Sequence, residues 1–107
     1  MNTDSNNKAK TEIALSHLKS VFDPEIGLNI VDLGLVYKID FGEDDQNIHV
    51  EMTLTSRFCP MGESITEGVR NILENAFAGS QITIDLVYEP AWNADMISEE
   101  GKLFLKY

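Results

Sequence analysis

Several residue types are scarce in this sequence, and each scarcity excludes something. Of 107 residues, one is cysteine, three are proline and eight are lysine or arginine, against 18 aspartates and glutamates. A single cysteine excludes an internal disulfide, and a net charge of −10 with dispersed cations argues against nucleic acid and anionic membranes as partners. No run approaches the ~20 apolar residues that cross a bilayer, and the first residues lack the apolar core of a secretory signal. We therefore predict a cytoplasmic protein.

The abundant residue types indicate one folded domain. Apolar residues make up 43% and charged residues 24% of the chain, which is typical of globular rather than disordered proteins. A chain of this length buries roughly two-thirds of its unfolded surface around one core. Residues 1–9 are polar and lack periodicity, so we predict a disordered tail there and a single domain over residues 10–107.

Apolar periodicity predicts the elements of that domain. Helical spacing predicts two helices, at 10–22 and 65–77, and a weaker pattern predicts a short last helix at 98–105. Alternation predicts three strands, at 35–41, 48–54 and 82–88. In the first strand, we expect Tyr37 to share the apolar face with Leu35, Ile39 and Phe41.

This order predicts an α+β fold. We expect a two-layer α/β sandwich, α-β-β-α-β(-α), with helices covering one face of a small three-stranded mixed sheet. The first two strands form an antiparallel hairpin, and the helix between the second and third strands allows those two to be parallel. With that pairing, the loops before the first strand and after the other two emerge at one end of the sheet.

Those loops carry the candidate functional residues, because binding residues concentrate in loops on a rigid scaffold. We expect them to form one shared surface site. Its members precede the first strand (Asp23, Glu25, Asp32), follow the second strand (Thr55, Ser56, Cys59) and follow the third strand (Glu89, Trp92).

Cys59 has two opposed interpretations. Pro60 suits the first position of a helix, and Cys59 would then be the N-cap, where the helix dipole lowers the pKa of a thiol and makes it reactive or metal-binding. However, Ser64 and Glu67 also form a capping box, which would start the helix four residues later. The alternative to a functional thiol is a small buried hydrophobic residue.

The other candidates also have structural interpretations. Aspartate before proline is a common turn former, and Gly27 and Gly34 allow unusual backbone angles, so Asp23, Glu25 and Asp32 could serve turns rather than a metal or a partner. Trp92 either packs back on the domain or serves an interface. His17 and His49 have no companion at ligand spacing, and we expect neither to bind metal.

Taken together, five short motifs resemble the SufT/PaaD-like domain family, within the iron–sulfur cluster assembly group. They occur in the same order over residues 11–105: Asp23-Pro24-Glu25, then 32–36 (DLGLV), then Thr53-x-Thr55-Ser56-x-x-Cys59-Pro60, then Glu89-Pro90-x-Trp92, and Met96-x-Ser98. The resemblance implies a two-layer α/β domain and a role in maturing iron–sulfur proteins. It also implies that Cys59 is the motif cysteine and that Asp23, Glu25 and Asp32 occupy acidic motif positions.

On this resemblance we expect a non-enzymatic assembly factor whose partners are iron–sulfur assembly proteins and client apoproteins. Cys59 would contact iron or a transient iron–sulfur cluster, and the other loop residues would support it or contact the partner. One cysteine cannot supply four thiolates, so we expect no stably bound cluster without a second chain, for example in a homodimer, or an exogenous thiol. Two alternatives remain: an accessory subunit of a multicomponent oxygenase, as in phenylacetate degradation, and an acidic interaction domain with an inert cysteine.

Overall fold

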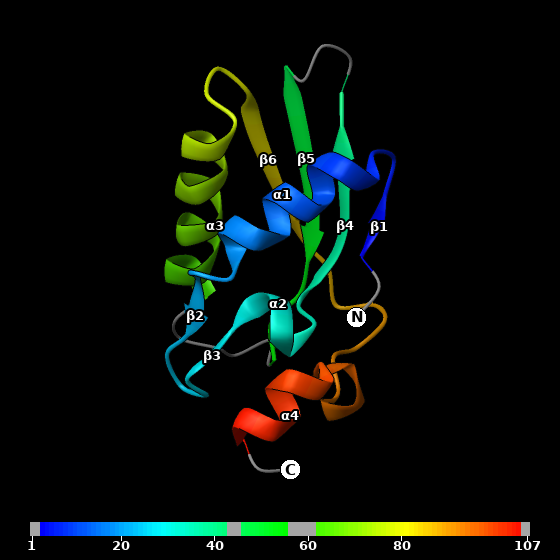
Figure 1. Ribbon diagram of the computed structural model, residues 1–107, viewed down its shortest axis with the longest axis vertical. Coiled ribbons are helices and arrows are strands. Elements are labelled where there is room, and N and C mark those ends of the chain that lie inside the picture. The colour runs from blue at the N-terminus through cyan, green and yellow to red at the C-terminus, as the bar shows by residue number, and fades with distance from the viewer. Residues whose placement is uncertain (1–2, 43–45, 56–61, 106–107) are drawn as a thin grey trace.

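The computed structural model describes residues 3–42, 46–55 and 62–105. Within these residues, short strands and helices precede a central hairpin, and a long helix leads to the last strand (Figure 1). In chain order the elements are β1 (Asp4–Ser5), α1 (Lys8–Leu18), β2 (Phe22–Asp23), β3 (Leu28–Asn29), α2 (Ile30–Leu33), β4 (Val36–Phe41), β5 (Asn47–Met52), α3 (Gly62–Ala76), β6 (Gln81–Leu86), a 3-10 turn (Ala94–Met96) and α4 (Glu99–Leu105).

The three predicted strands form most of one mixed sheet. Its order is β1-β4-β5-β6, in which β4 and β5 are antiparallel while β5 and β6 are parallel. Helix α3 makes the crossover between β5 and β6 that a parallel pair requires. The predicted fold class and the parallel pairing of the second and third strands are therefore confirmed.

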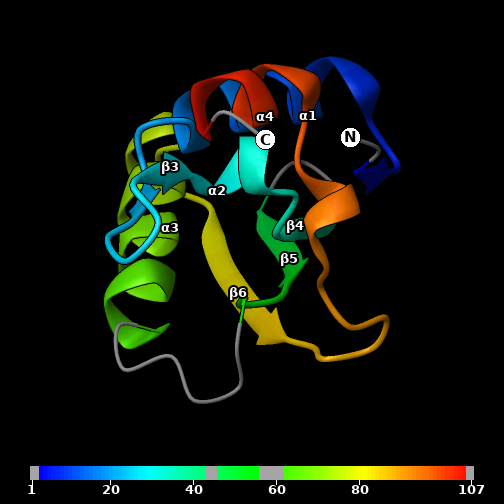
Figure 2. The same cartoon turned by 90° about the horizontal axis from the view of Figure 1, so that it is seen from below.

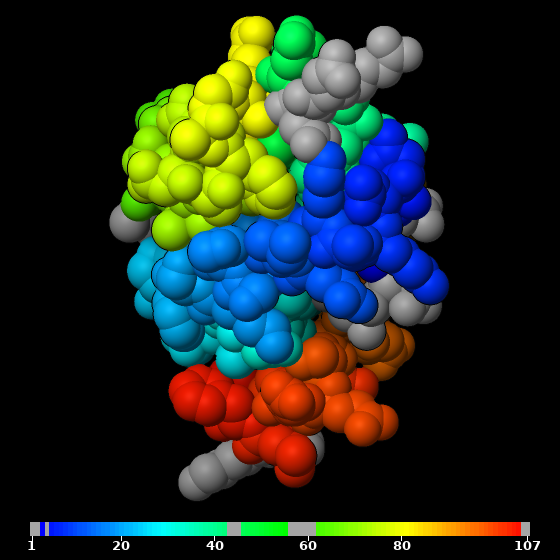
Figure 3. All heavy atoms as spheres, turned by 45° about the horizontal axis from the view of Figure 1, so that its top comes forward, coloured from blue at the N-terminus to red at the C-terminus, as the bar shows by residue number. Residues whose placement is uncertain are grey.

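Helices α1 and α3 cover one side of the sheet, α2 and α4 lie at its lower end in Figure 1, and no described helix covers the other side (Figure 2). Atoms of α1 and α3 meet over the covered face (Figure 3). Ile65, Val69 and Leu73 of α3 are at most 2% exposed and pack on the inward side chains of the strands. Each such side chain contributes about 2 kcal/mol by leaving water. No helix in the described ranges is long and apolar enough to span a membrane.

Residues 3–9, which we predicted to be part of a disordered tail, contain β1 and the start of α1. Strand β1 pairs in parallel with β4, and Asn6 exchanges two hydrogen bonds with the backbone of Phe41, at 2.8 and 2.9 Å. Asn7 caps α1 by accepting from the Lys10 amide. Because polar side chains make these contacts, hydrophobic periodicity gave no signal. Residues 1 and 2 of the predicted tail lie outside the described residues.

The segment between α1 and β4 also differs from the prediction. The first helix ends at Leu18 rather than at Phe22, whose side chain is 54% exposed in β2. Strands β2 and β3 form a separate two-stranded hairpin that leads into α2. Elements of two to four residues are too short to show periodicity, and this is why the pattern missed them.

A β-bulge changes which residues of β4 face the core. The pairing with β5 shifts between Val36 and Lys38, so Tyr37 is the extra residue. Val36, Ile39 and Phe41 are buried, whereas Tyr37 is half-buried. The prediction that Tyr37 shares the inner face with Ile39 is wrong, because the bulge shifts the alternation by one residue.

Candidate functional site

The strand ends from which the predicted loops leave lie at one end of the sheet. Met52, the last residue of β5, pairs with Val36 at the start of β4 and with Leu86 at the end of β6. The connections after β5 and β6 therefore leave the sheet where β4 begins. This arrangement follows from the antiparallel and parallel pairings alone.

The connection after β5 is only partly described. Thr55 is half-buried just after β5, whereas Ser56 and Cys59 lie outside the described residues. Helix α3 already includes Gly62 and Glu63, so the alternative in which Ser64 is its N-cap is wrong. The proposed N-cap position of Cys59 stays a prediction.

Asp23 forms a turn. Its side chain is 1% exposed, and Oδ1 accepts hydrogen bonds from the amides of Glu25 at 2.9 Å and Ile26 at 3.3 Å. The Gly27 amide donates to the Asp23 carbonyl at 2.7 Å. These contacts match the turn interpretation of Asp23. They leave the exposed Glu25 as the carboxylate of this loop that faces solvent.

Asp32 joins α2 to the start of α4. Its carboxylate accepts from Asn29 Nδ2 at 2.7 Å and from Ser98 Oγ at 2.8 Å, and its carbonyl accepts from the Ser98 amide at 2.8 Å. Ser98 Oγ in turn accepts from the amide of Gly101 at 3.0 Å, which caps α4. A charge-assisted hydrogen bond is stronger than a neutral one. The carboxylate of Asp32 therefore holds two helix starts together.

Gly34 and Trp92 complete this contact. Gly34 ends α2 at φ +80°, and a Cβ there would lie 2.3 Å from the carbonyl oxygen of Met96. Trp92 is half-buried, and its Nε1 donates to the Leu33 carbonyl at 2.7 Å. We call Asp32, Gly34, Trp92, Met96 and Ser98 the α2–α4 junction. It unites three of the sequence motifs, and in it Trp92 packs back on the domain.

Tyr37 is the functional candidate that sequence reasoning missed. Its hydroxyl donates to the Pro90 carbonyl at 2.8 Å and to Met96 Sδ at 3.5 Å. Burial raises the pKa of Tyr37 above its ordinary value of 10.0, and a hydrogen bond with Thr53 lowers it by less. The bulge that turns Tyr37 outward has no signature in the sequence pattern.

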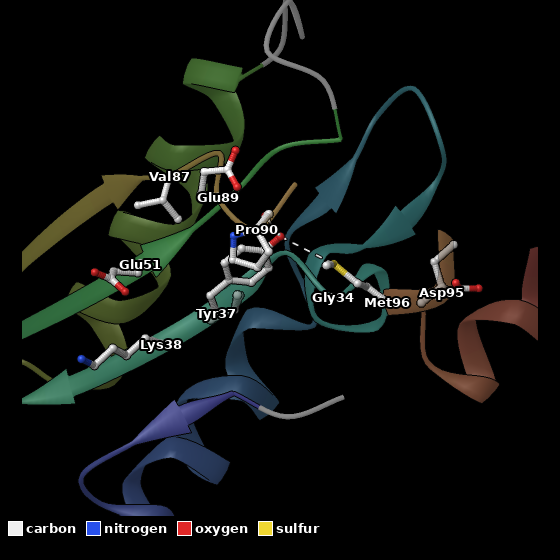
Figure 4. Close-up of a pocket in the computed structure, with 11 residues that line it drawn as sticks. Gly34, Tyr37, Lys38, Glu51, Val87, Glu89, Pro90, Asp95 and Met96 are labelled. Atoms are coloured by element: carbon white, nitrogen blue, oxygen red, sulfur yellow. Dashed lines mark hydrogen bonds between the residues drawn. The ribbon is translucent and has the colours of Figure 1, made fainter. Parts of the chain in front are cut away.

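Beside Tyr37 lies a cavity of about 560 Å³. We call it the open-face groove, because it lies where the segment after β6 crosses the side of the sheet without helices (Figures 2 and 4). Its apolar lining includes Tyr37, Val87, Pro90 and Met96. Glu89 also lines it and is exposed, and the peptide bond between Glu89 and Pro90 is cis. Such a volume is typical of ligand-binding clefts.

The described residues contain no group of three or more His, Cys, Asp or Glu side chains that could hold a metal ion. His49 Nε2 contacts the carboxylate of Asp85, and His17 lies in the last turn of α1. The donor set offered to iron by the described part of the chain is thus one of isolated carboxylates and imidazoles. A cluster would need thiolates, which only Cys59 could supply.

Residues 12–86 match the sequence profile of the family described as "Iron-sulfur cluster assembly protein". Over 90 residues the chain is 46% identical to a Porphyromonas gingivalis protein named "Fe-S protein maturation auxiliary factor", covering 84% of this chain and 85% of that one. It is 42% identical over 86 residues to the Staphylococcus aureus "Fe-S protein maturation auxiliary factor SufT", covering 79% and 96%. A solved domain of unknown function from Bacillus anthracis superposes with a TM-score of 0.86 at 33% identity, covering 92% and 93%.

Proposed function

The chain belongs to the family of iron–sulfur cluster assembly proteins, and on this premise we propose that it helps deliver iron–sulfur clusters to client apoproteins. The observation that carries the proposal is the family match over residues 12–86. It spans the whole β5–α3–β6 unit, including the segment with Cys59. The cluster is cargo in this role rather than a resident cofactor.

Cys59 is the proposed contact with that cargo. It is the only thiol of the chain and belongs to the segment that joins Thr55 to Gly62. Clusters are held by cysteine thiolates, usually four, so the remaining ligands come from a client, a carrier, a second copy or a small thiol. This shortage supports transient hand-off, in which an open coordination position lets the client's thiolates replace the first set.

The protein acts in this proposal as an auxiliary factor without catalysis of its own. The two relatives named above are called auxiliary factors, which supports that role. Glu25, Thr55 and Glu89 are the proposed partner contacts, because they are exposed or half-buried at the loops in question. Asp23, Asp32 and Trp92 support the loops through the hydrogen bonds described above. The homodimer, the role of Ser56 and the cytoplasmic location stay predictions.

Cluster transfer is the direct test. The purified protein is incubated anaerobically with iron, sulfide and a thiol, and then with an apo-enzyme that regains activity on receiving a cluster. We expect the wild type to accelerate reactivation and Cys59→Ser to lose at least about tenfold of that acceleration, because a hydroxyl is a poor ligand for iron–sulfur clusters. Ser64→Ala, which changes an exposed residue of α3, is the control.

Two outcomes would count against the proposal. If Cys59→Ser transfers clusters as fast as the wild type, the thiol is not the contact. If iodoacetamide labels Cys59 only after denaturation, the inert-cysteine alternative is favoured. If the chain is instead an oxygenase subunit, neither the wild type nor Cys59→Ser accelerates reactivation of the apo-enzyme. The wild type then binds stably to the other oxygenase subunits.

A further inference from the structure

The open-face groove carries an excess of negative charge. Glu51, Glu89 and Asp95 line it together with a single cation, Lys38. Lys38 is the cross-strand partner of Glu51, and its ammonium lies 3.5 Å from Asp40, a carboxylate outside the lining. Among salt bridges between described residues, none involves the three lining carboxylates. The groove therefore favours a ligand that brings positive charge.

The charges are distributed along the groove rather than gathered at one point. Figure 4 shows Glu51 and Asp95 toward opposite ends of the lining, with Tyr37 and Pro90 between them and Glu89 beside Pro90. Glu51 belongs to β5, whereas Asp95 belongs to the 3-10 turn before α4. The hydrogen bond from Tyr37 to Pro90 fixes the apolar middle. An elongated ligand with an apolar centre and positive ends fits this order.

We propose that the open-face groove binds an extended segment of a partner protein, in which an apolar side chain lies between two arginine or lysine side chains. The apolar side chain would contact Tyr37, Pro90 and Met96, and the two cations would face Glu51 and Asp95. A second copy of this chain is disfavoured because each copy carries a net charge of −10. A nucleic acid is disfavoured for the same reason. The proposal goes beyond cluster delivery and does not involve Cys59.

The probes are fluorescein-labelled synthetic peptides of about ten residues, long enough to lie extended along a groove. Each has a central leucine and two arginines at a series of spacings, and matched peptides carry glutamate in place of arginine. We expect at least one arginine peptide to bind, more weakly as salt rises, and the glutamate peptides not to bind. Amide resonances of Tyr37, Glu51 and Val87 should shift on binding, and those of α1 should not.

Two double variants with the same change in net charge separate the groove from general attraction. Glu51→Gln with Asp95→Asn should raise the dissociation constant about fivefold, because two exposed ion pairs are lost. Glu12→Gln with Glu74→Gln, at exposed positions of α1 and α3, should leave it unchanged. Cys59→Ser should bind the peptide like the wild type, so a failure of cluster transfer leaves this result intact.

Several outcomes would overturn the proposal. Absence of binding by every arginine peptide would do so, as would equal binding of the glutamate peptides. Equal weakening in both double variants would show that only net charge matters. If the polyamine spermine, at the same concentration as the peptide, displaces the peptide, the apolar centre of the peptide contributes nothing to its binding. If the wild type is a dimer and the variant with Glu51→Gln and Asp95→Asn is a monomer, the groove binds a second copy of the chain.

Discussion

The α2–α4 junction and the open-face groove share Gly34 and Met96, but their polar groups have different partners. In the junction, both oxygens of the Asp32 carboxylate accept side-chain hydrogen bonds, and the Trp92 indole is paired with a backbone carbonyl. In the groove, Tyr37 is hydrogen-bonded, whereas Glu89 and Asp95 are exposed and form no ion pair with a described residue. Motif residues in the first region hold the fold, whereas the motif residue Glu89 in the second faces solvent.

The same contrast divides the acidic residues that sequence reasoning grouped together. Asp23 and Asp32 accept hydrogen bonds from the chain, while Glu25 and Glu89 face solvent. Charge and proximity in the sequence do not distinguish these roles. Stability measurements do, because replacing a hydrogen-bonded carboxylate destabilises the fold and replacing an exposed one does not.

The largest effect is expected for Gly34→Ala in the junction. The substitution places a side chain at φ +80° and a Cβ 2.3 Å from the Met96 carbonyl oxygen, so we expect the free energy of unfolding to fall by about 3 kcal/mol. Urea denaturation followed by circular dichroism measures it. Gly27→Ala is the matched control: its φ is +82° but nothing lies within 4 Å, and about 1 kcal/mol of backbone strain is expected. Equal losses would mean that close packing against Met96 contributes nothing.

Asp32→Ala should have the second largest effect. It leaves Asn29 Nδ2 and Ser98 Oγ without their acceptor, and we expect a loss of about 2 kcal/mol in the free energy of unfolding. Glu25→Ala changes an exposed carboxylate and should stay within about 0.5 kcal/mol of the wild type. If Glu25→Ala destabilises as much as Asp32→Ala, the division between structural and exposed acids is wrong.

Trp92→Phe should have a smaller effect on the junction. An aromatic ring, although a smaller one, is retained, but the hydrogen bond to the Leu33 carbonyl is lost, so we expect about 1 kcal/mol less stability at neutral pH. Thermal unfolding by circular dichroism is the measurement, since the variant lacks the only tryptophan of the chain. A variant as stable as the wild type would show that water replaces the indole at no cost.

Whether a helix or strand could be predicted from the sequence depended on its length. The helices at 8–18 and 62–76 and the three long strands have enough residues for apolar periodicity to be visible, and the parallel β5–β6 pair followed from the connecting helix. The β2–β3 hairpin and α2 are short and are held by hydrogen bonds of Asp23 and Asn29. Strand β1 is held by polar contacts. None of these produces a hydrophobic pattern.

The positions of the strand ends beside the candidate site were predictable, but the contacts of its described residues were not. Topology placed the loops at one end of the sheet, whereas the bonding partners of Asp32 and Trp92 come from residues about 60 positions away in the chain. A bulge places Tyr37 at the groove, and an alternating apolar pattern does not reveal a bulge. Long-range partners and local shifts in register are properties of the folded chain.

The smallest effect is expected in the groove, from Tyr37→Phe, and it depends on pH. Burial raises the pKa of Tyr37 in the folded state above the ordinary value of 10.0. As the pH rises past that value, the unfolded chain loses the Tyr37 proton first, so this residue's contribution to stability is present below about pH 10 and is lost as the pH rises through the folded pKa. At pH 7 the variant loses the hydrogen bonds of the hydroxyl, mainly the one to the Pro90 carbonyl and a longer one to Met96 Sδ, together less than about 1 kcal/mol.

The measurement is urea denaturation of wild type and Tyr37→Phe at neutral pH and at several values above pH 10. We expect the free energy of unfolding of the wild type to fall more steeply with alkaline pH than that of the variant, so that the difference between them narrows. A difference that stays constant from neutral to alkaline pH would show that Tyr37 ionises equally in both states. Tyr37 would then be as open to solvent as Glu89, and the groove would lack the apolar middle that separates it from an ordinary acidic surface.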